Sequence, residues 1–264
     1  MSISQAVSLI VLLGACFALF GGLGRLFPCN PGRPLFVSRS IGLDLGYCLL
    51  GLLYAGAAPL AAAAVAPASV WLQHRTGGAQ LQRLPMIGQL AILLVATDFG
   101  QYWLHRAFHH RWLWPFHAVH HSATDVNWTT TFRTHPVNYL ALNASLGVAA
   151  AALGFSPLTL LLAAPIFFFS GALTHANLNW TFGRLRHVAA SPVFHRWHHS
   201  ADPAAQSSNF APMFPVWDVV FGTFRMPEGR RPQVFGAEGA PRGFLRQLIQ
   251  PFAALGRAAL GRAT

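Results

Sequence analysis

Histidine dominates the chemistry that this chain can perform. Its 264 residues include 13 histidines, and most of these fall into three dense groups. The groups are one His-x-x-x-His pair and two His-x-x-His-His triplets, at His105, His109, His117, His120, His121, His195, His198 and His199. Residues three and four positions apart share one face of a helix, so each group can aim two or three imidazoles at one point.

Imidazole is a good ligand for iron, copper, zinc and nickel. Eight such ligands could hold two metal ions at about four each, with a position left for oxygen or substrate. His175 ends a further apolar stretch, which we expect to place it on the same side of a membrane as the three groups, and it would be a ninth ligand. A lone histidine is usually a hydrogen-bonded or surface residue, but burying this many imidazoles costs free energy unless they are bonded or liganded. The three groups therefore predict a metal centre.

The acidic residues exclude several other kinds of metal enzyme. The chain has 7 aspartates and glutamates, and no glutamate precedes Glu228. Soluble di-iron bundles need glutamates and Glu-x-x-His pairs on their helices. Zincins need His-Glu-x-x-His, and zinc deaminases need a catalytic glutamate. The predicted metal site must therefore be made mainly of imidazole.

Two further residues are candidates for positioning the metal ligands. Asp98 lies inside an apolar stretch and precedes His105 by two helical turns, so it shares that helix face. We expect its carboxylate to accept a hydrogen bond from the free ring nitrogen of a ligand histidine, which would fix the tautomer. Pairing of Asp98 with a nearby arginine is the alternative. His135, in Arg-Thr-His-Pro, is a second candidate, whereas His110 would point away from the His105 face.

Membrane helices are the elements expected to position these histidines. The chain is 53% hydrophobic and 9% charged, against about 25% charged residues in soluble domains. Five apolar stretches cover about residues 3–23, 41–65, 86–104, 137–155 and 158–173, and a bilayer-spanning helix takes ~20 residues. The tight break at 154–157 predicts that the last two stretches form a helical hairpin, which could be re-entrant. The first stretch lacks a basic leader region, which indicates an anchor and not a signal peptide.

The basic residues, all of them arginine, indicate which side of the membrane the loops occupy. Most arginines follow the first, third and fifth apolar stretches or lie in the C-terminal tail, which places those segments on the cytoplasmic side. We attribute the formal net charge of +11 to this anchoring and to anionic headgroups. Nucleic-acid binding is disfavoured, because the arginines are scattered between apolar stretches. The mixed basic and apolar tail from Arg242 to Arg262 predicts either an amphipathic surface helix or an ordinary frayed end.

The complete pattern resembles the fatty acid hydroxylase/sterol desaturase superfamily. The resemblance covers about residues 86–226 and is carried by DFGQYWLHRAFH at 98–109, WPFHAVHHS at 114–122, RTHP at 133–136, THAN at 174–177, VFHRWHHS at 193–200, NF at 209–210 and WDVVFGT at 217–223. It implies an all-α integral-membrane bundle of about four transmembrane helices, beneath a cytosolic, helical, histidine-rich catalytic cap. We expect membrane helices in residues 1–85, the catalytic domain in 86–226 and a basic amphipathic tail in 227–264.

The resemblance also implies two iron ions, molecular oxygen as the oxidant and an external electron donor. The implied metal ligands are His105, His109, His117, His120, His121, His175, His195, His198 and His199. Asn209 and Asp218 would brace the site, and Asp218 could orient a ligand histidine. The family often has another histidine near His175, where this chain has Asn177, so the ligand number stays open.

The expected reaction is hydroxylation or desaturation of a lipid, such as a fatty acyl chain or a sterol. The chain has neither a Gly-x-Gly-x-x-Gly motif after a strand nor a Cys-x-x-Cys-His haem motif. The electrons are therefore expected from a separate cytochrome, ferredoxin or flavin reductase. We expect the protein in a bacterial inner membrane, with its catalytic face in the cytoplasm.

Three other classes of protein compete with this interpretation. A zinc-dependent membrane hydrolase could use the same histidines, because imidazole also binds zinc. A histidine-rich metal transporter is less favoured, since its sites should lie at mid-bilayer, whereas these histidines follow the apolar stretches. A membrane b-type cytochrome would need isolated histidines deep in paired helices and not His-His doublets.

Overall fold

A computed structural model of the chain describes residues 3–33, 40–76 and 78–259. Within these ranges the secondary structure is helical, with two isolated β-bridges and no strand. The prediction of an all-α fold is therefore confirmed.

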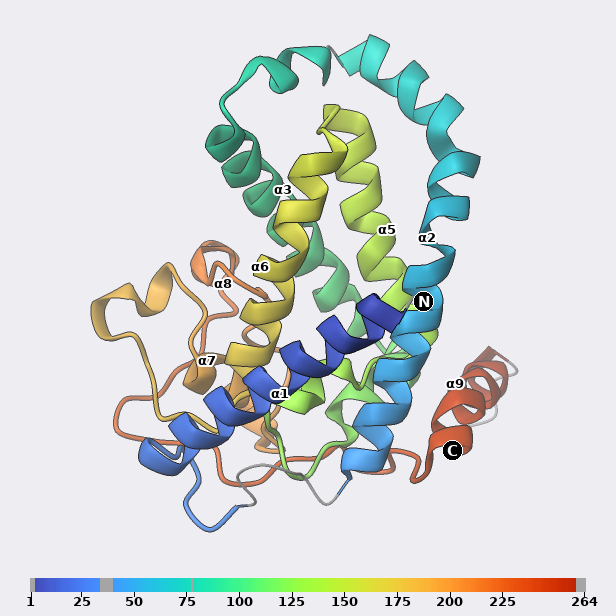
Figure 1. Cartoon of the computed structure of the whole chain (residues 1–264). Helices are drawn as coiled ribbons and strands as arrows, with labels where there is room; N and C mark the ends of the chain where they lie inside the picture. Colours follow the sequence, from blue (N-terminus) through green and yellow to red (C-terminus); the bar gives the residue numbers. More distant parts are fainter. Residues whose placement is uncertain (1–2, 34–39, 77, 260–264) are drawn as a thin grey trace.

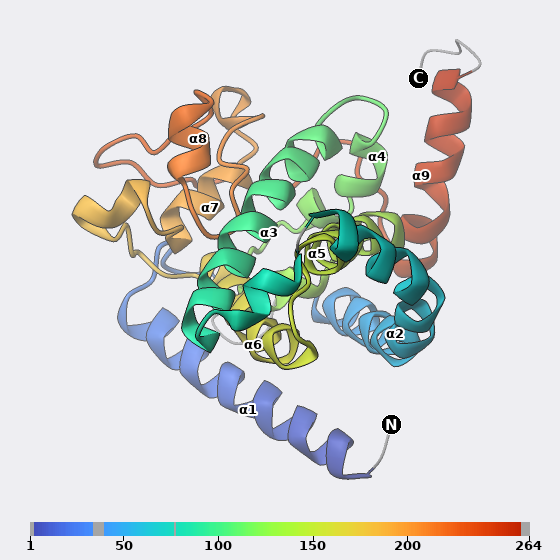
Figure 2. The same cartoon turned by 90° about the horizontal axis from the view of Figure 1, so that it is seen from above.

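Five long helices correspond to the five predicted apolar stretches. They are α1 (Ile3–Leu26), α2 (Ile41–Thr76), α3 (Met86–Phe108), α5 (Pro136–Leu153) and α6 (Pro157–His175). α5 lies between α2 and α3, α6 runs back from the end of α5 and packs on α3, and α1 crosses this group at an angle (Figures 1 and 2). α3 and α6 end in the part of the molecule that holds the shorter helices, and they bring their last histidines there.

The α5–α6 connection forms the predicted hairpin. Gly154 ends α5 with a φ of 72°, a left-handed conformation that glycine adopts without steric cost. Ser156 then caps α6, because its side chain accepts a hydrogen bond from the backbone nitrogen of Thr159, and Pro157 follows at the first helical position. The short 3₁₀ helix η1 (Gly78–Arg83) packs beside this turn, where Gln82 Nε2 donates to the Gly154 carbonyl at 2.7 Å.

Membrane-spanning capacity is clearest in α6. Among the described residues, the segment Leu158–His175 is the one that is both long and apolar enough to cross a bilayer, judged by length and composition. The apolar segments Ile10–Leu26 and Ile41–Tyr54 are shorter. The number of membrane spans therefore stays a prediction.

Shorter helices build the part of the molecule around the histidines. They are α4 (Trp114–His117), η2 (His120–Ser122), η3 (Trp128–Phe132), η4 (Gly183–His187), α7 (Pro192–His198), η5 (Pro203–Ala205), α8 (Val216–Val220) and α9 (Phe244–Ala259). α7 and α8 lie on one side of α3, and α4 and α9 lie on the other (Figure 2). The histidine groups are thus surrounded by elements from distant parts of the sequence.

A buried ion pair fixes the start of α2 to the segment that follows η3. Arg133 and Asp44 are 1% and 0% exposed, and Arg133 Nε donates to Asp44 Oδ1 at 2.7 Å. Thr129 in η3 donates from its hydroxyl to the other carboxylate oxygen at 2.6 Å. Each charge is compensated and hydrogen-bonded, as a buried ion requires.

The predicted tail is a helix and not a frayed end over its described length. α9 covers Phe244–Ala259, and its side chains Leu245, Ile249 and Phe252 are 70%, 65% and 54% exposed in one stripe. α9 also packs against α4, where the ring of Phe252, at the edge of this stripe, lies 5.1 Å from that of Phe116. Contact of the exposed stripe with a membrane stays a prediction, and residues 260–264 of the tail lie outside the described ranges.

Candidate metal centre

The nine histidines predicted as ligands all meet in one place. α3 supplies His105 and, as the residue that ends it, His109; α4 supplies His117, and η2 supplies His120 and His121. His175 is the last residue of α6. α7 begins with Ser191 as its cap and Pro192 at its first position, and this turn sets the direction of His195, His198 and His199. All nine side chains are buried apart from the half-buried His109.

The first group consists of five histidines whose candidate ligand atoms all lie within 4.8 Å of one another: His105, His109, His117, His121 and His198. The Nε2 atoms of His105 and His117 are 2.9 Å apart. Those of His121 and His198 are 3.0 Å apart, and those of His121 and His117 are 3.2 Å apart. The rings therefore point their Nε2 atoms toward a common centre.

The second group consists of the other four histidines: His120, His175, His195 and His199. His175 is at its centre, because its Nε2 lies 3.2 Å from that of His120, 3.0 Å from that of His195 and 3.1 Å from that of His199. The two groups adjoin, since the rings of His121 and His199 stack at a centroid separation of 4.5 Å.

The spacing within each group fits a metal ion. Two nitrogen ligands at about 2.0–2.1 Å from one ion lie about 2.9 Å apart when the bond angle is 90° and about 3.4 Å apart at the tetrahedral angle. The observed Nε2–Nε2 separations of 2.9 to 3.2 Å fall in that interval. Five imidazoles around one centre and four around the other also leave room for exogenous ligands.

Ring tautomers give a second and independent indication of a cation. The Nδ1 of His105 lies 2.7 Å from the Phe210 carbonyl, that of His120 lies 3.0 Å from the Arg133 carbonyl, and that of His175 lies 2.7 Å from the Gly171 carbonyl. A carbonyl only accepts hydrogen bonds, so each of these Nδ1 atoms carries the proton and each Nε2 is an unprotonated lone pair.

The facing Nε2 atoms therefore repel one another when the imidazole rings are neutral and no cation lies between them. His120 and His175 both direct lone pairs at a point between them, at a separation of 3.2 Å. No hydrogen bond can form between two unprotonated nitrogens. A bound cation would convert this repulsion into coordination, which is the arrangement that metal-ligating histidines adopt when their other nitrogen donates to a carbonyl.

Burial keeps these rings in the form that binds metal. For His117, His120 and His121, and for His195, His198 and His199, burial is the largest cause of a pKa well below the ordinary histidine value, and neighbouring imidazoles lower the pKa further. The unprotonated imidazole is the species that ligates a metal.

The predicted role of Asp98 needs correction. It accepts hydrogen bonds not from a ligand ring but from the backbone nitrogens of Met213 and Phe214, at 2.8 and 3.1 Å, and from Trp217 Nε1 at 2.9 Å. Met213 and Phe214 belong to the loop before α8, and Trp217 belongs to α8 itself. This part of the chain returns from a distant position in the sequence to lie against α3. Asp98 therefore holds this loop in place.

Asp218 and Asn209 brace the same loop from its other end. Asp218 accepts hydrogen bonds from the backbone nitrogens of Phe210 and Ala211 at 2.8 and 2.9 Å, and burial raises the pKa of its carboxyl. The Phe210 carbonyl is the acceptor for His105, so Asp218 acts on that ring through one residue of backbone. Asn209, with a φ of 58°, donates from Nδ2 to the carbonyls of Phe194 and Arg225.

His135 lies at the start of α5, where it caps the helix. Its Nδ1 accepts a hydrogen bond from the Val137 nitrogen at 3.1 Å, and its Nε2 faces the Leu248 carbonyl of α9 at 3.2 Å. It contributes to neither histidine group. Its position connects α9 to the start of α5.

Sequence reasoning missed the groups that orient the ligand rings. Asn138 Oδ1 lies 2.8 Å from His117 Nδ1, and the Ser208 carbonyl lies 2.7 Å from His198 Nδ1. Backbone acceptors carry no sequence signal. Asp44 did carry one, as an acid at the first turn of a predicted apolar helix, and it supports Arg133, whose carbonyl orients His120.

A largely apolar cavity of about 520 Å³ opens onto both histidine groups. Its inner end is formed by histidines of the two groups, among them His117, His120 and His195. Its walls come from α2, α5 and α6 and include Gly51, Leu142, Leu146, Phe167 and Phe168. Such a space is suited to an aliphatic chain whose end or middle lies beside the two histidine groups.

Comparison with known proteins gives a consistent result. A model of the fatty acid hydroxylase family matches residues 90–223. The chain is 38% identical over 183 residues to the ornithine lipid hydroxylase OlsE of Rhizobium tropici, covering 66% of this chain and 53% of that protein. It is 29% identical to the alkylglycerol monooxygenase of Danio rerio, covering 50% of this chain and 30% of that protein.

A third relative is methylsterol monooxygenase 1-3 of Arabidopsis thaliana, with 26% identity over 53% of this chain and 49% of that protein. The chain thus spans about half the length of the first of these relatives and less than a third of the second. No solved structure matches it.

Proposed function

Because the chain belongs to the fatty acid hydroxylase family, we propose that it is a membrane-bound di-iron monooxygenase that hydroxylates a lipid. The observation that carries this proposal is the convergence of nine imidazole nitrogens into groups of five and four, with unprotonated lone pairs facing one another. The names of its relatives refer to an ornithine lipid, alkylglycerols and a methylsterol, which supports a lipid as the substrate.

The histidines would hold the two iron ions, the first with five imidazoles and the second with four. When bound, the metal pair would supply the reduction of oxygen and the insertion of one oxygen atom into a C–H bond, with two electrons and two protons from outside. The chain's own contribution is positional. Backbone carbonyls fix the ring tautomers, and the apolar cavity holds the lipid chain and excludes water.

The same proposal includes the arrangement in the membrane. Helices α1, α2, α3 and the α5–α6 hairpin would supply about four spans, with residues 86–226 as the catalytic domain and its cap in the bacterial cytoplasm. The exposed apolar side chains Leu53, Ile87 and Leu161, at 71%, 76% and 68%, support contact of these helices with lipid. Residues 1–85 would then be the anchor, and 227–264 the surface tail.

Metal analysis combined with lipid oxidation tests the proposal. The purified protein in lipid nanodiscs should contain two iron ions, and it should take up oxygen and add one oxygen atom to a lipid, as measured by mass spectrometry. Loss of two hydrogens would indicate desaturation. Metal-dependent cleavage without oxygen uptake would contradict the proposal and identify a zinc-type hydrolase.

Single histidine variants connect the activity to the two groups. His120→Ala should lose the second metal ion and His198→Ala the first, because these residues belong to different groups, and both changes should abolish oxidation. His110→Ala is the matched control, since His110 is exposed and lies in neither group. Oxidation that survives both His120→Ala and His198→Ala would show that the ligand assignment is wrong.

A further inference from the structure

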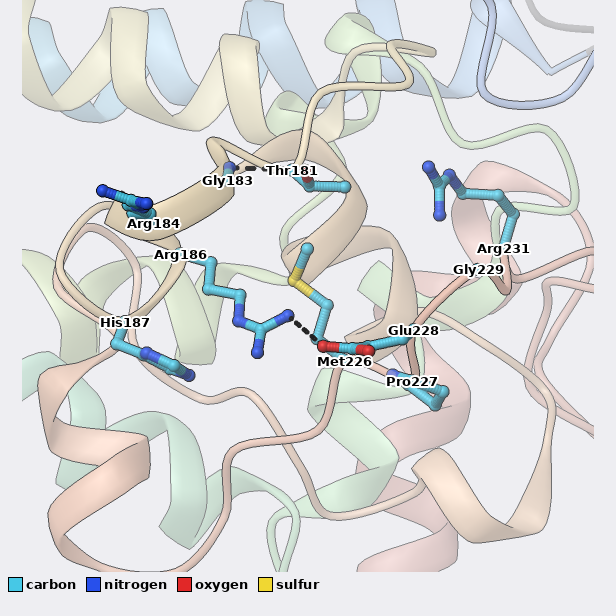
Figure 3. Close-up of a pocket in the computed structure, with 10 residues that line it drawn as sticks. All are labelled: Thr181, Gly183, Arg184, Arg186, His187, Met226, Pro227, Glu228, Gly229 and Arg231. Carbon is cyan, nitrogen blue, oxygen red and sulfur yellow. Dashed lines mark hydrogen bonds and ion pairs between the residues drawn. The ribbon is translucent and has the colours of Figure 1, made fainter.

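A second hollow lies on the surface, lined by η4 and by the segment 226–231 (Figure 3). Its volume is about 620 Å³. Three arginines surround it, Arg184, Arg186 and Arg231, and Glu228 is the acid among its described lining residues. Glu228 is 83% exposed and pairs with Arg186 at 3.1 Å. The guanidinium groups of Arg184 and Arg231 therefore give the hollow a net positive charge.

Apolar side chains accompany this charge. Leu185 and Val188, next to the arginines in sequence, are 62% and 57% exposed. Arginine beside exposed aliphatic side chains is a composition typical of protein–protein interfaces, whereas a site for a small anion needs only the charges. The surface around the hollow, formed by η4 and residues 226–231, is called the basic face below.

A line of ring contacts leads from the basic face to the second histidine group. His187 is exposed, and its ring lies 4.7 Å from that of Phe224. The Phe224 ring stacks at 5.6 Å on Phe194, which is fully buried. Phe194 is bonded in sequence to His195, whose Nε2 points at the centre of the second group. Two ring contacts and one step along the backbone thus connect the surface to a candidate metal ligand.

We propose that the basic face is the docking site of a small acidic electron-carrier protein, and that the His187–Phe224–Phe194 line is its route to the metal centre. The inference rests on the proposed function, in which R–H, O2, two electrons and two protons give R–OH and water. An iron–sulfur carrier of the ferredoxin type gives up one electron at each encounter, so two carriers are oxidised per lipid hydroxylated.

Charge complementarity suits this kind of encounter. Electron-transfer complexes are small and short-lived, and opposite charges speed their formation without requiring a large buried area. The attraction between exposed charges is screened by salt over about 8–10 Å at physiological ionic strength. Binding of the carrier should therefore weaken steeply as salt is added.

Charge reversal on the basic face tests the docking site. The full-length, metal-loaded protein is placed in nanodiscs of zwitterionic lipid, and binding of a recombinant acidic plant-type ferredoxin is measured by biolayer interferometry at low and high salt. Arg184→Glu combined with Arg231→Glu should weaken binding at low salt by about tenfold or more and reduce its salt dependence. The matched control is Arg242→Glu with Arg246→Glu, which makes the same charge change at two exposed arginines, one just before α9 and one in its first turn, and should alter binding by less than about twofold.

The route is tested by the rate of reduction. Each variant is first shown to keep the parent's metal content, and reduction of the metal centre by ferredoxin is then followed by stopped-flow absorbance. His187→Ala should lower the reduction rate by a larger factor than it lowers the affinity. A variant in which both fall by the same factor would contradict the route.

Two results would overturn the docking site. One is ferredoxin binding that responds equally to charge reversal at the basic face and at the control pair. The other is binding of nanodiscs with anionic lipid, in place of ferredoxin, that depends on Arg184 and Arg231. The binding measurement needs no turnover. A protein that binds ferredoxin as expected, yet oxidises no lipid when reduced by dithionite, would therefore count against the proposed function and not against the docking site.

Discussion

Replacing Asp44 with asparagine tests whether a buried ion pair maintains the second histidine group. Asp44 and Arg133 are almost completely buried, and Arg133 Nε donates to the carboxylate at 2.7 Å. The carbonyl of Arg133 in turn accepts the hydrogen bond from His120 Nδ1 at 3.0 Å. Asp44→Asn keeps the shape of the side chain and a hydrogen-bond acceptor but leaves the guanidinium without a counter-charge.

The expected loss of stability is large. Removing one partner of a buried ion pair destabilises a protein by about 3–5 kcal/mol. For chains somewhat smaller than this one, each kcal/mol lowers the melting temperature by about 2–4 °C, so Asp44→Asn should lower it by at least about 6 °C. The parent and the variant are compared by tryptophan fluorescence in one detergent at one heating rate, because the melting temperature of an irreversibly unfolding protein depends on the scan rate.

The chain offers a matched control in Asp125. Its carboxylate is 8% exposed and lies 2.8 Å from Arg33 Nη1, but the Arg33 side chain is 36% exposed, so water screens this pair in a way that it cannot screen Asp44–Arg133. Such a pair contributes about 0–1 kcal/mol, so Asp125→Asn should change the melting temperature by no more than about 4 °C. Asp44→Asn should also release the second metal ion to a chelator faster than Asp125→Asn does. If the two variants melt together and hold metal equally, burial of the Asp44–Arg133 pair is not what stabilises the site.

Two further predictions concern glycines. A Cβ at Gly171 in α6 would lie 2.7 Å from Thr131 Oγ1, so Gly171→Ala should destabilise the protein by about 1–3 kcal/mol. The control is Gly147→Ala in α5, where a Cβ would have no atom within 4 Å, and this change should be neutral or stabilising by up to about 1 kcal/mol. Equal melting temperatures of the two variants would mean that α6 and η3 are not in close contact. Gly51 lines the apolar cavity and has open space around it, so Gly51→Phe should lower oxidation of long-chain lipids more than of short-chain lipids in a competition assay. Gly42→Phe, on the same helix but outside the cavity lining, is the control, and the same loss for both chain lengths would place the lipid elsewhere.

Local signals in the sequence were sufficient to predict the helices and the candidate ligands. Apolar runs of about the length of a helix predicted α1, α2, α3, α5 and α6, and the Gly154–Pro157 break predicted the hairpin, because both depend on neighbouring residues only. Histidine spacing identified eight members of the two groups, and the position of His175 at the end of an apolar stretch identified the ninth.

Long-range contacts explain what the sequence could not predict. Asp98 shares a helix with His105, so a hydrogen bond to a ligand ring was the expectation from helical periodicity. Its partners are instead Met213, Phe214 and Trp217, more than a hundred residues away in sequence. Two of these partners are backbone nitrogens, which every non-proline residue has, and no pattern of residue types identifies them.

The sequence also did not predict how the histidines divide between the two groups, and this division has a structural consequence. In each His-x-x-His-His triplet the first and last histidines, four residues apart, enter one group, while the middle histidine enters the other: His117 and His121 join the first group and His120 the second, whereas His195 and His199 join the second and His198 the first. In the second triplet, on α7 and its cap, His195 and His199 are four residues apart and share a face, and His198 is turned from His199 by about 100°. The first triplet runs from α4 into the 3₁₀ helix η2 and divides in the same way. Each triplet therefore contributes histidines to both groups: the first gives two to the first group and one to the second, and the second triplet does the reverse. A single triplet cannot form either group alone, so α7 must dock against the α4–η2 segment before either site is complete. This interdependence makes the two metal positions one structural unit, in which loss of one ion should loosen the ligands of the other.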